Sequence, residues 1–153
     1  MIKTKSYKIY LSGGMTGLTE KEMRTWRLEV KNKIWLNETN VDFFDPTEQF
    51  EYVYQYLPLK HEAEEFQMKF DIRNLVDSDL IVCNISSNPQ SVGTNIELGI
   101  AYNLHIPIII YNPSKIELHP WHDSVADYKT EDMETLIEII EEYYLLWQSN
   151  LEM

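Results

Sequence analysis

One carboxylate in the amino-acid sequence lies in an otherwise uncharged segment. Glu97 belongs to Ser91–Tyr111, which reads SVGTNIELGIAYNLHIPIIIY and joins a glycine turn to an apolar run. A charge in such surroundings is costly unless it has a function, and a carboxylate there can act as an acid, a base or a nucleophile. The alternative is structural: a helix that starts near Val92 or Gly93 would place Glu97 in its first turn, where the helix dipole favours a negative charge.

Other residues that could do chemistry give weaker indications. SGGMTG, at Ser12–Gly17, is glycine-rich but is neither a P-loop nor the dinucleotide-binding fingerprint, so a ligand-binding loop and a tight turn are equally good interpretations. His119 and His122 could hold a metal, but two histidines in a proline-containing loop are more often surface residues, and we expect no metal. Cys83 lies in an apolar run, which favours a buried, inert thiol.

The composition limits the partners and the compartment. The chain has 153 residues, with 13 basic against 25 acidic side chains and a formal net charge of -12. A field of that sign repels DNA, RNA and anionic membranes, although local donors can still bind a small nucleotide. The single cysteine allows no intramolecular disulfide, and the apolar stretch at the N-terminus is too short for a signal peptide. We therefore expect a cytoplasmic protein with one domain.

Short β-rich runs alternate with longer helical segments, which predicts an α/β fold. The expected strands are Tyr7–Leu11, Val41–Pro46, Ser78–Ile85 and Ile106–Tyr111. The expected helices are Thr19–Leu36, His61–Val76, Thr94–Leu104 and Thr130–Trp147. The aromatic stretch Thr47–Lys60 is expected to form an ordered loop or a short helical excursion. Together these elements predict a doubly wound, flavodoxin-like or Rossmann-like sheet of about four to five mostly parallel strands, flanked by helices.

Ligands of such sheets bind beyond the carboxyl ends of the strands. Three loops are expected to meet there: YLSGGMTG after the first strand, NISSNPQSVGT after the third and YNPS after the fourth. Each is rich in small or turn-forming residues, which let backbone amides approach a ligand. Glu97 therefore follows closely on a predicted ligand-binding loop.

Three motifs resemble, in this order, the nucleoside 2-deoxyribosyltransferase family and its relatives, the 2′-deoxynucleoside 5′-monophosphate N-glycosidases. They are KIYLSGGMTG, FDIRNLVDSDLIVCNI and SVGTNIELGIAYNLHIPIIIY, and the similarity runs from about Tyr7 to Asn112. The resemblance implies a single domain of this family over residues 1–153, with no cofactor and no metal. It also implies an enzyme that acts on the N-glycosidic bond of a deoxynucleoside or deoxynucleotide.

The resemblance assigns roles to three residues. Glu97 falls on the glutamate that attacks the anomeric carbon, Asp71 on the aspartate that protonates or holds the departing base, and Tyr10 on the tyrosine that orients the nucleophile. Cleavage of an N-glycosidic bond passes through an oxocarbenium-like state, so it needs a carboxylate against the anomeric carbon and an acid for the leaving base. Without the resemblance, Asp71 would be interpreted as a solvated helix residue and Tyr10 as part of the core.

The substrate stays open between two classes. The deoxyribosyltransferases carry an aspartate where this chain has Ser91, whereas the monophosphate glycosidases carry a phosphate-binding serine there. In the first loop those glycosidases use a serine and an arginine, for which Gly14 and Thr16 stand here, so the positive charge is missing. Thr16 and the backbone amides of Gly13 and Gly14 could still bind an anion. With Gly93, these residues are the predicted substrate contacts.

Transfer to a nucleobase and hydrolysis by water share the same first step, so both reactions stay open. A non-catalytic module that binds a nucleotide is the alternative from another class. The expected partners are a deoxynucleoside or deoxynucleotide and a free nucleobase. A homo-oligomer is also expected, because relatives complete their pockets across subunits and because Tyr143, Tyr144 and Trp147 suit an interface.

Overall fold

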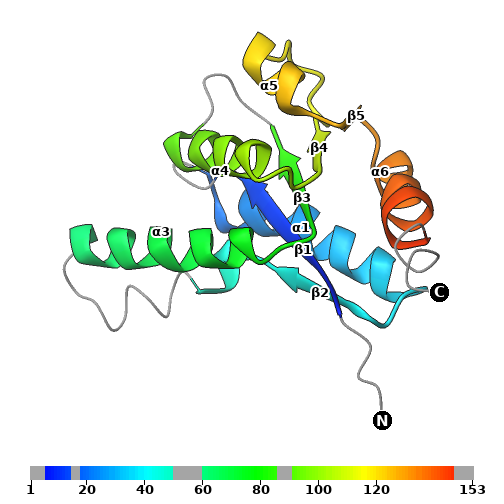
Figure 1. Ribbon diagram of the computed structural model, residues 1–153, viewed down its shortest axis with the longest axis horizontal. Helices are drawn as coiled ribbons and strands as arrows, with labels where there is room; N and C mark the ends of the chain where they lie inside the picture. Colours follow the sequence, from blue (N-terminus) through cyan, green and yellow to red (C-terminus); the bar gives the residue numbers. More distant parts are fainter. Residues whose placement is uncertain (1–5, 15–17, 50–59, 86–90, 147–153) are drawn as a thin grey trace.

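The computed structural model describes residues 6–14, 18–49, 60–85 and 91–146. Within these ranges the chain forms a five-stranded, all-parallel sheet in the order β2-β1-β3-β4-β5 (Figure 1). The strands are β1 Tyr7–Gly13, β2 Val41–Phe44, β3 Leu80–Asn84, β4 Ile108–Tyr111 and β5 Tyr128–Thr130. The strand order reverses at β1, since β2 lies on one side of it and all later strands lie on the other.

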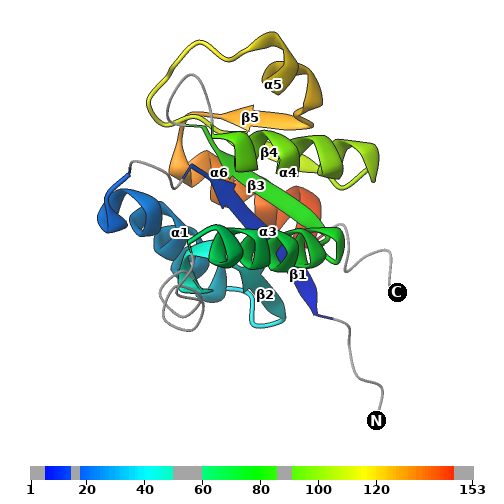
Figure 2. The ribbon, with the colours of Figure 1, turned by 90° about the vertical axis from the view of Figure 1, so that its left-hand side faces the viewer.

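Helices cover both faces of the sheet. They are α1 Glu20–Trp35, α3 Lys60–Val76, α4 Val92–Asn103, α5 Pro120–Val125 and α6 Met133–Ile139, with a 3-10 turn at Pro46–Gln49 and a π-helical turn at Ile140–Leu145. Figure 2 shows α3 and α4 in front of the sheet and α1 and α6 behind it. The predicted α/β class, parallel sheet and flanking helices are therefore confirmed. Among the described helices, none is long and apolar enough to cross a membrane.

The alternation of side chains along β1 divides the core into two layers. Ile9 and Leu11 pack with buried residues of α1 and α6. Tyr10 points to the opposite face, where it packs with Cys83 of β3 and with buried residues of α3 and α4. Because strand residues alternate, Ser12 projects to the same face as Tyr10. The polar end of β1 therefore faces α3 and α4.

Helix α1 begins where the sequence predicts, at a capping box. The Thr19 hydroxyl accepts a hydrogen bond from the Glu22 N–H at 3.1 Å, and Glu22 Oε1 accepts one from the Thr19 N–H at 3.1 Å. Val30 and Ile34, one turn apart, are fully buried against the sheet. The capping box thus fixes the start of α1, and the apolar stripe fixes the face that it presents to β1.

The last helix and the fifth strand differ from the prediction. The helix begins at Met133, not Thr130, because the Asp132 carboxylate accepts a hydrogen bond from the Thr135 N–H at 3.0 Å and caps it. Thr130 instead ends β5, which pairs with β4. β5 has 3 residues, of which only Thr130 is buried, so the sequence carries no strand pattern there. With β5 the sheet has five strands, which is the larger of the two numbers predicted.

The predicted loop around His119 and His122 contains a short helix, because Pro120–Val125 forms α5. Proline fits the start of a helix, where its missing N–H would have no partner, and His119 caps α5 by accepting a hydrogen bond from a backbone N–H of its first turn. In the stretch Thr47–Lys60, the 3-10 turn Pro46–Gln49 agrees with a short helical excursion. Residues 50–59, which hold the aromatic side chains of this stretch, lie outside the described ranges.

Candidate active site

Three residues predicted for catalysis come together from three elements. Tyr10 lies on β1, Asp71 on α3 and Glu97 on α4, all on the same face of the sheet. Burial raises the pKa of the Tyr10 phenol well above its usual value, and the charges of Glu97 and Asp71 raise it further. The three groups are thus close enough to affect one another's ionisation. They gather at the carboxyl end of β1, where the strand order reverses, and doubly wound sheets bind their ligands at such a point.

Ser91, not Glu97, caps helix α4. The Ser91 hydroxyl accepts a hydrogen bond from the Thr94 N–H at 3.3 Å and lies 2.7 Å from the Thr94 hydroxyl oxygen. Glu97 lies beyond the first turn that this cap begins, so the interpretation that it stands in the first turn is wrong. A Cβ on Gly93 would lie 4.0 Å from Glu97 Oε1, so Gly93 adds no side chain beside the carboxylate. Helix capping therefore does not explain why position 97 is a glutamate.

Three buried oxygen atoms at this place have no hydrogen-bond partner among the described residues. They are the Tyr10 hydroxyl, the Ser12 hydroxyl and Glu97 Oε2. Glu97 as a whole is half-buried, while its Oε2 is fully buried. Unpaired buried polar atoms are rare in folded proteins and cost free energy. The two hydroxyls are near enough to Glu97 to lower its pKa, although no hydrogen bond of ordinary geometry joins them to it, and buried donors placed in this way beside an acceptor are typical of a functional site rather than of a core.

Burial raises the pKa of the Glu97 carboxyl to about 7. The Tyr10 hydroxyl opposes that rise most, followed by the positive charge of Arg27 and by the Ser12 hydroxyl. Since the pKa of Tyr10 is raised, its phenol stays neutral and can donate a hydrogen bond to the carboxylate. Glu97 is therefore a carboxyl that titrates near neutral pH, with two hydroxyl groups directed at it.

Asp71 is a second carboxyl that titrates near neutral pH. It is 8% exposed, and burial raises its pKa to about 7. Gln67 opposes this rise, because its side-chain amide donates a hydrogen bond to Asp71 Oδ1 at 2.6 Å, whereas the charge of Glu97 adds to it. Because the charge of Glu97 raises the pKa of Asp71, the pair favours a state in which Glu97 is ionised and Asp71 is protonated. The alternative interpretation, in which Asp71 is a solvated helix residue, is thus wrong.

Aromatic rings hold α3 against the sheet at this site. The rings of Tyr10 and Phe44 stack with their centroids 5.2 Å apart, and the Phe44 and Phe70 rings lie 5.7 Å apart. Phe70 directly precedes Asp71 on α3. Aromatic pairs in this range are attractive beyond the area that they bury. The packing therefore holds this part of α3 against β1 and β2.

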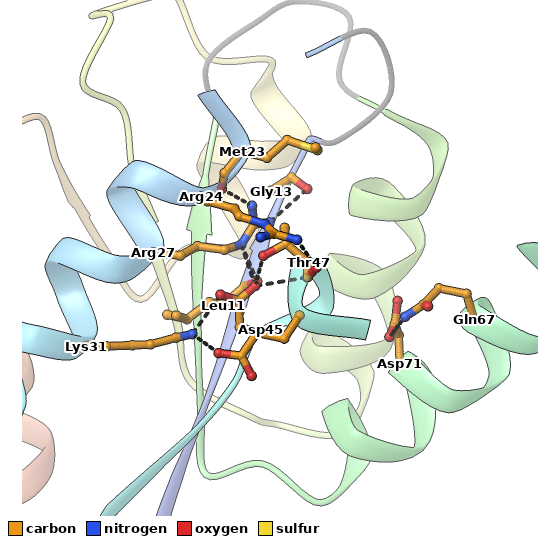
Figure 3. A network of polar contacts seen from close by, with 11 residues as sticks. Leu11, Gly13, Met23, Arg24, Arg27, Lys31, Asp45, Thr47, Gln67 and Asp71 are labelled. Carbon is orange, nitrogen blue, oxygen red and sulfur yellow. Dashed lines mark hydrogen bonds and ion pairs between the residues drawn. The ribbon is translucent and has the colours of Figure 1, made fainter. Parts of the chain in front are cut away.

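A buried network of charges beside β1 was not predicted from the sequence (Figure 3). Arg27 and Lys31 of α1 are buried, as is Asp45, which follows β2. Lys31 Nζ lies 2.7 Å from Asp45 Oδ2, and Arg27 Nε lies 3.6 Å from Asp45 Oδ1. Burial acts to raise the pKa of Asp45, but hydrogen bonds from Lys31 and Thr47 outweigh it and lower the pKa. The signal in the sequence is that both cations occur one turn apart on the apolar face of α1.

Gly14, directly after β1, lines a small pocket. A space of about 200 Å³ is lined by Gly14, Leu18, Glu22, Trp26 and Asn84. Gly14 leaves room for a ligand, because a Cβ there would meet only Leu18 at 3.8 Å. Gly13 does not, because a Cβ there would come within 3.2 Å of the Trp26 ring, so packing explains this glycine. Thr16, the third predicted contact of the loop, lies outside the described residues.

The two histidines of the predicted metal alternative have other partners. His119 Nδ1 accepts a hydrogen bond from the Trp121 N–H at 3.1 Å. His122 Nε2 lies 2.8 Å from the Asn95 side-chain oxygen, in the first turns of α4. In the part of the chain that the structure describes, no three or more histidine, cysteine, aspartate or glutamate side chains are grouped as metal ligands would be.

Comparison with known proteins identifies one family. The model of the family described as nucleoside 2-deoxyribosyltransferase matches residues 9–139. The 2-deoxyribosyltransferase from Bacillus psychrosaccharolyticus is 21% identical, with a TM-score of 0.67 over 85% of this chain and 90% of that one. A conserved protein from Enterococcus faecalis V583 is 18% identical, with a TM-score of 0.72 over 90% of this chain and 98% of that one. The CMP N-glycosidase BcmB of Clostridium botulinum is 13% identical, with a TM-score of 0.57 over 89% of this chain and 98% of that one. No curated protein matches.

Proposed function

The chain belongs to the nucleoside 2-deoxyribosyltransferase family, and from this premise we propose that it cleaves the N-glycosidic bond of 2′-deoxynucleosides through a covalent glycosyl intermediate on Glu97. The deoxyribosyl group then passes to another nucleobase or to water. The observation that carries this proposal is the meeting of Tyr10, Asp71 and Glu97 in one buried cluster with two carboxyls that titrate near pH 7.

In the first step, one oxygen of the ionised Glu97 carboxylate forms a bond to the anomeric carbon. The bond from that carbon to the base nitrogen breaks, and its electron pair stays on the base. Asp71, protonated at this stage, gives its proton to the leaving base, so the base departs neutral. The state required for this step has one proton on the pair of carboxyls, and the charge of Glu97 favours this state because it raises the pKa of Asp71.

In the second step, a nucleobase N–H or a water O–H gives its proton to the Asp71 carboxylate while its nitrogen or oxygen attacks the anomeric carbon. The bond to Glu97 breaks, and the carboxylate is restored. Two displacements on opposite faces retain the configuration of the sugar. Tyr10, as a neutral donor, keeps the Glu97 side chain oriented in both steps and stabilises it whenever it is ionised.

A second substrate class, the deoxynucleoside 5′-monophosphates, is favoured by Ser91. This residue caps α4, so its hydroxyl lies at the positive end of a helix dipole, and it replaces a carboxylate that would repel a phosphate. Arg27 does not supply a cation to such a phosphate, because it is fully buried and bonded to backbone carbonyls. Deoxynucleosides are therefore the first candidate and their monophosphates the second.

A homo-oligomer is part of the proposal. Tyr143, near the C-terminal end of the described chain, is 68% exposed, and an exposed tyrosine on a helical segment suits a contact between subunits. Tyr144 is half-buried, and Trp147 lies outside the described residues. Sedimentation velocity tests the assembly, and a monomer at all concentrations would contradict it.

The proposed function is tested by offering deoxyadenosine with cytosine, and separately each deoxynucleoside 5′-monophosphate, to the wild type and to Glu97→Gln. New deoxycytidine indicates a transferase, and base released only from the monophosphates indicates a nucleotide hydrolase. Glu134→Gln is the matched control, since this exposed glutamate lies on α6, across the sheet from the site. Intact bound nucleotide without turnover would indicate a binding module.

The covalent intermediate has its own test. A 2′-fluoro-arabinosyl nucleoside slows the second displacement, so the glycosyl-enzyme accumulates and adds the mass of the sugar to the protein. Peptide mapping should place this mass on the peptide that contains Glu97, and Glu97→Gln should show none. An adduct elsewhere, or turnover that survives in Glu97→Gln, would refute the mechanism.

A further inference from the structure

β1 extends beyond the end of β2, which is its neighbour on one edge. The parallel register of β1 with β2 runs from Tyr7 paired with Val41 to Tyr10 paired with Phe44, where β2 stops. Leu11 and Gly13 lie beyond this point, and as alternate residues of a strand they point their carbonyls to the same side. On the other edge, β3 continues to pair with β1 as far as Gly13. The last carbonyls on the β2 side therefore need other donors.

Arg27 of α1 supplies these donors (Figure 3). Its Nε donates a hydrogen bond to the Leu11 carbonyl at 3.3 Å, and its Nη2 donates one to the Gly13 carbonyl at 3.3 Å. Its Nη1 donates to the Met23 carbonyl of its own helix. The guanidinium is fully buried, so these bonds are made without competition from water. The planar fork of an arginine thus takes the position along β1 that a further residue pair of β2 would occupy.

The side chain of Arg27 is itself held in place. Trp26 lies beneath the guanidinium, with the central carbon 4.8 Å from the ring centroid, and Asp45 Oδ1 lies 3.6 Å from Nε. Gly13 is close-packed here, since a Cβ on it would come within 3.3 Å of Arg27 Nη2. A side chain fixed on three sides is a rigid support for the strand end that it contacts.

The segment that Arg27 supports carries the two hydroxyl groups of the site. Ser12 lies between the two carbonyls that accept from Arg27, and Tyr10 directly precedes them. Both side chains face Glu97, the proposed nucleophile. A displacement of this segment by about 1 Å would move both donors away from the carboxylate, and displacements of this size are costly in catalysis.

We propose that Arg27 is a positioning residue of this site, which takes the place of β2 along the end of β1 and thereby holds the Tyr10 and Ser12 hydroxyls beside the Glu97 carboxylate. This inference rests on the proposed function for its kinetic consequence only. Its structural consequence, a dependence of the Glu97 carboxylate on Arg27, can be measured without turnover.

Several groups face the Glu97 carboxylate and determine its titration. Tyr10 and Ser12 face it from β1, and the charge of Arg27 reaches it from α1; its own charge in turn affects Cys83 of β3 and Asp71 of α3. The titratable groups that face Arg27 are Asp45, Glu97, Tyr10 and Cys83. Only Arg27 among them is a cation, so its removal should leave Glu97 harder to ionise.

The test compares Arg27→Met and Arg27→Lys with the wild type, with Lys31→Met as the matched control. Lys31 is also a buried cation of α1 and also pairs with Asp45, but its ammonium donates to the carboxylates of Asp45 and Glu48, whereas Arg27 donates to carbonyls of β1. Its loss should destabilise the fold without affecting the site. Carbon-13 NMR of the glutamate carboxyls, with the Glu97 signal assigned from its absence in Glu97→Gln, follows the titration of Glu97 in each variant.

Arg27→Met should raise the pKa of Glu97 by about 1 unit, whereas Lys31→Met should leave it unchanged. Arg27→Lys keeps the charge but cannot donate to both carbonyls in a fork, so the two hydroxyls should move away from Glu97: its pKa should still rise, by less than in Arg27→Met, and kcat should fall about tenfold. Arg27→Lys also decides the question if Arg27→Met does not fold. Equal shifts in Arg27→Met and Lys31→Met, or full activity of Arg27→Lys, would overturn the proposal. An inactive wild type would refute the proposed function, and the titration would still decide on Arg27.

Discussion

The side-chain amide of Gln67 donates a hydrogen bond to Asp71 Oδ1 at 2.6 Å, from one turn earlier on α3. Gln67 is itself buried, so this donor stabilises the ionised carboxylate in a place where little water reaches it. Burial raises the pKa of Asp71 to about 7, and the hydrogen bond from Gln67 is the largest contribution that lowers it. Asp71 is proposed to work as an acid in the first step and as a base in the second, so a pKa near neutral serves both.

The first prediction concerns the pH profile of kcat/KM. It should be bell-shaped with a maximum near pH 7, because activity is lost at low pH when Glu97 becomes protonated and at high pH when Asp71 loses its proton. Gln67→Leu removes the donor that stabilises ionised Asp71, so the alkaline limb should move up by about 0.5 to 1 unit. Release of free base, measured from pH 5 to 9, checks this. A limb that moves down, or one that does not move, would contradict the assignment of Asp71.

The second prediction concerns stability. The raised pKa of Glu97 means that the folded state binds its proton more tightly than the unfolded state does. The contribution of this proton to the free energy of unfolding is fully present below pH 4.5, the ordinary pKa of a glutamate. It is lost as the pH rises through about 7, the pKa of Glu97 in the folded state. Glu97→Gln removes this loss, so the variant should be more stable than the wild type at pH 8 by on the order of 1 kcal/mol.

Urea unfolding at pH 8 and at pH 5.5 checks this prediction. The advantage of Glu97→Gln should shrink at the lower pH, where the wild-type carboxyl is largely protonated. Glu134→Gln, an exposed glutamate on α6, should show no such pH dependence. A variant that is less stable than the wild type at pH 8 would mean that the Glu97 carboxylate supports the fold, not only the site.

The sequence predicts most of this fold because its signals are local. β3 and β4 are apolar runs buried along their whole length, and the Thr19 capping box marks the start of α1. β5 was not predicted, because its sequence has no alternation of apolar and polar residues and it becomes a strand only by pairing with β4. The sequence gives two starts for α4, near Val92 and at Thr94, and the cap that Ser91 makes with the Thr94 N–H selects the first.

The site could be predicted only in part, for a physical reason. Glu97 is recognisable because it is a charge in an uncharged segment, which is a property of the sequence alone. The role of Arg27 is not recognisable, because it depends on where β2 leaves β1 and on the position of Asp45, 18 residues later in the chain. Contacts of this kind are set by tertiary structure, so only a cation on an apolar helix face hints at them.

The third prediction concerns the buried charges. Asp45 accepts hydrogen bonds from Lys31 Nζ at 2.7 Å and from the Thr47 N–H at 2.9 Å, and it lies beside Arg27. Asp45→Ala leaves two buried cations without their carboxylate, so it should lower the free energy of unfolding by about 3 to 5 kcal/mol. Asp42→Ala, an exposed aspartate of β2, should change it by about 0.5 kcal/mol at most. Urea unfolding compares the two, and equal effects would show that the network is not stabilising.

The fourth prediction separates the hydroxyl of Tyr10 from its ring. The ring is fully buried and stacks on Phe44 with centroids 5.2 Å apart, so Tyr10→Phe should keep the packing and the fold. The hydroxyl is the largest influence that opposes the raised pKa of Glu97, so its loss should raise that pKa and move the acidic limb of kcat/KM up by about 0.5 to 1 unit. Loss of the orienting donor should also lower kcat by about 10- to 100-fold.

Tyr7→Phe is the matched control for this variant. Tyr7 lies on the same strand, but it packs against the core on the α1 and α6 face, away from Glu97. Its loss of a hydroxyl should therefore leave both limbs of the profile and kcat as in the wild type. If Tyr10→Phe behaves like Tyr7→Phe, the Tyr10 hydroxyl does not act on Glu97, and Ser12 would be the remaining hydroxyl of β1 that can orient the carboxylate. If only Tyr10→Phe moves the acidic limb, the orienting donor belongs to Tyr10, because both variants lose one tyrosine hydroxyl from the same strand.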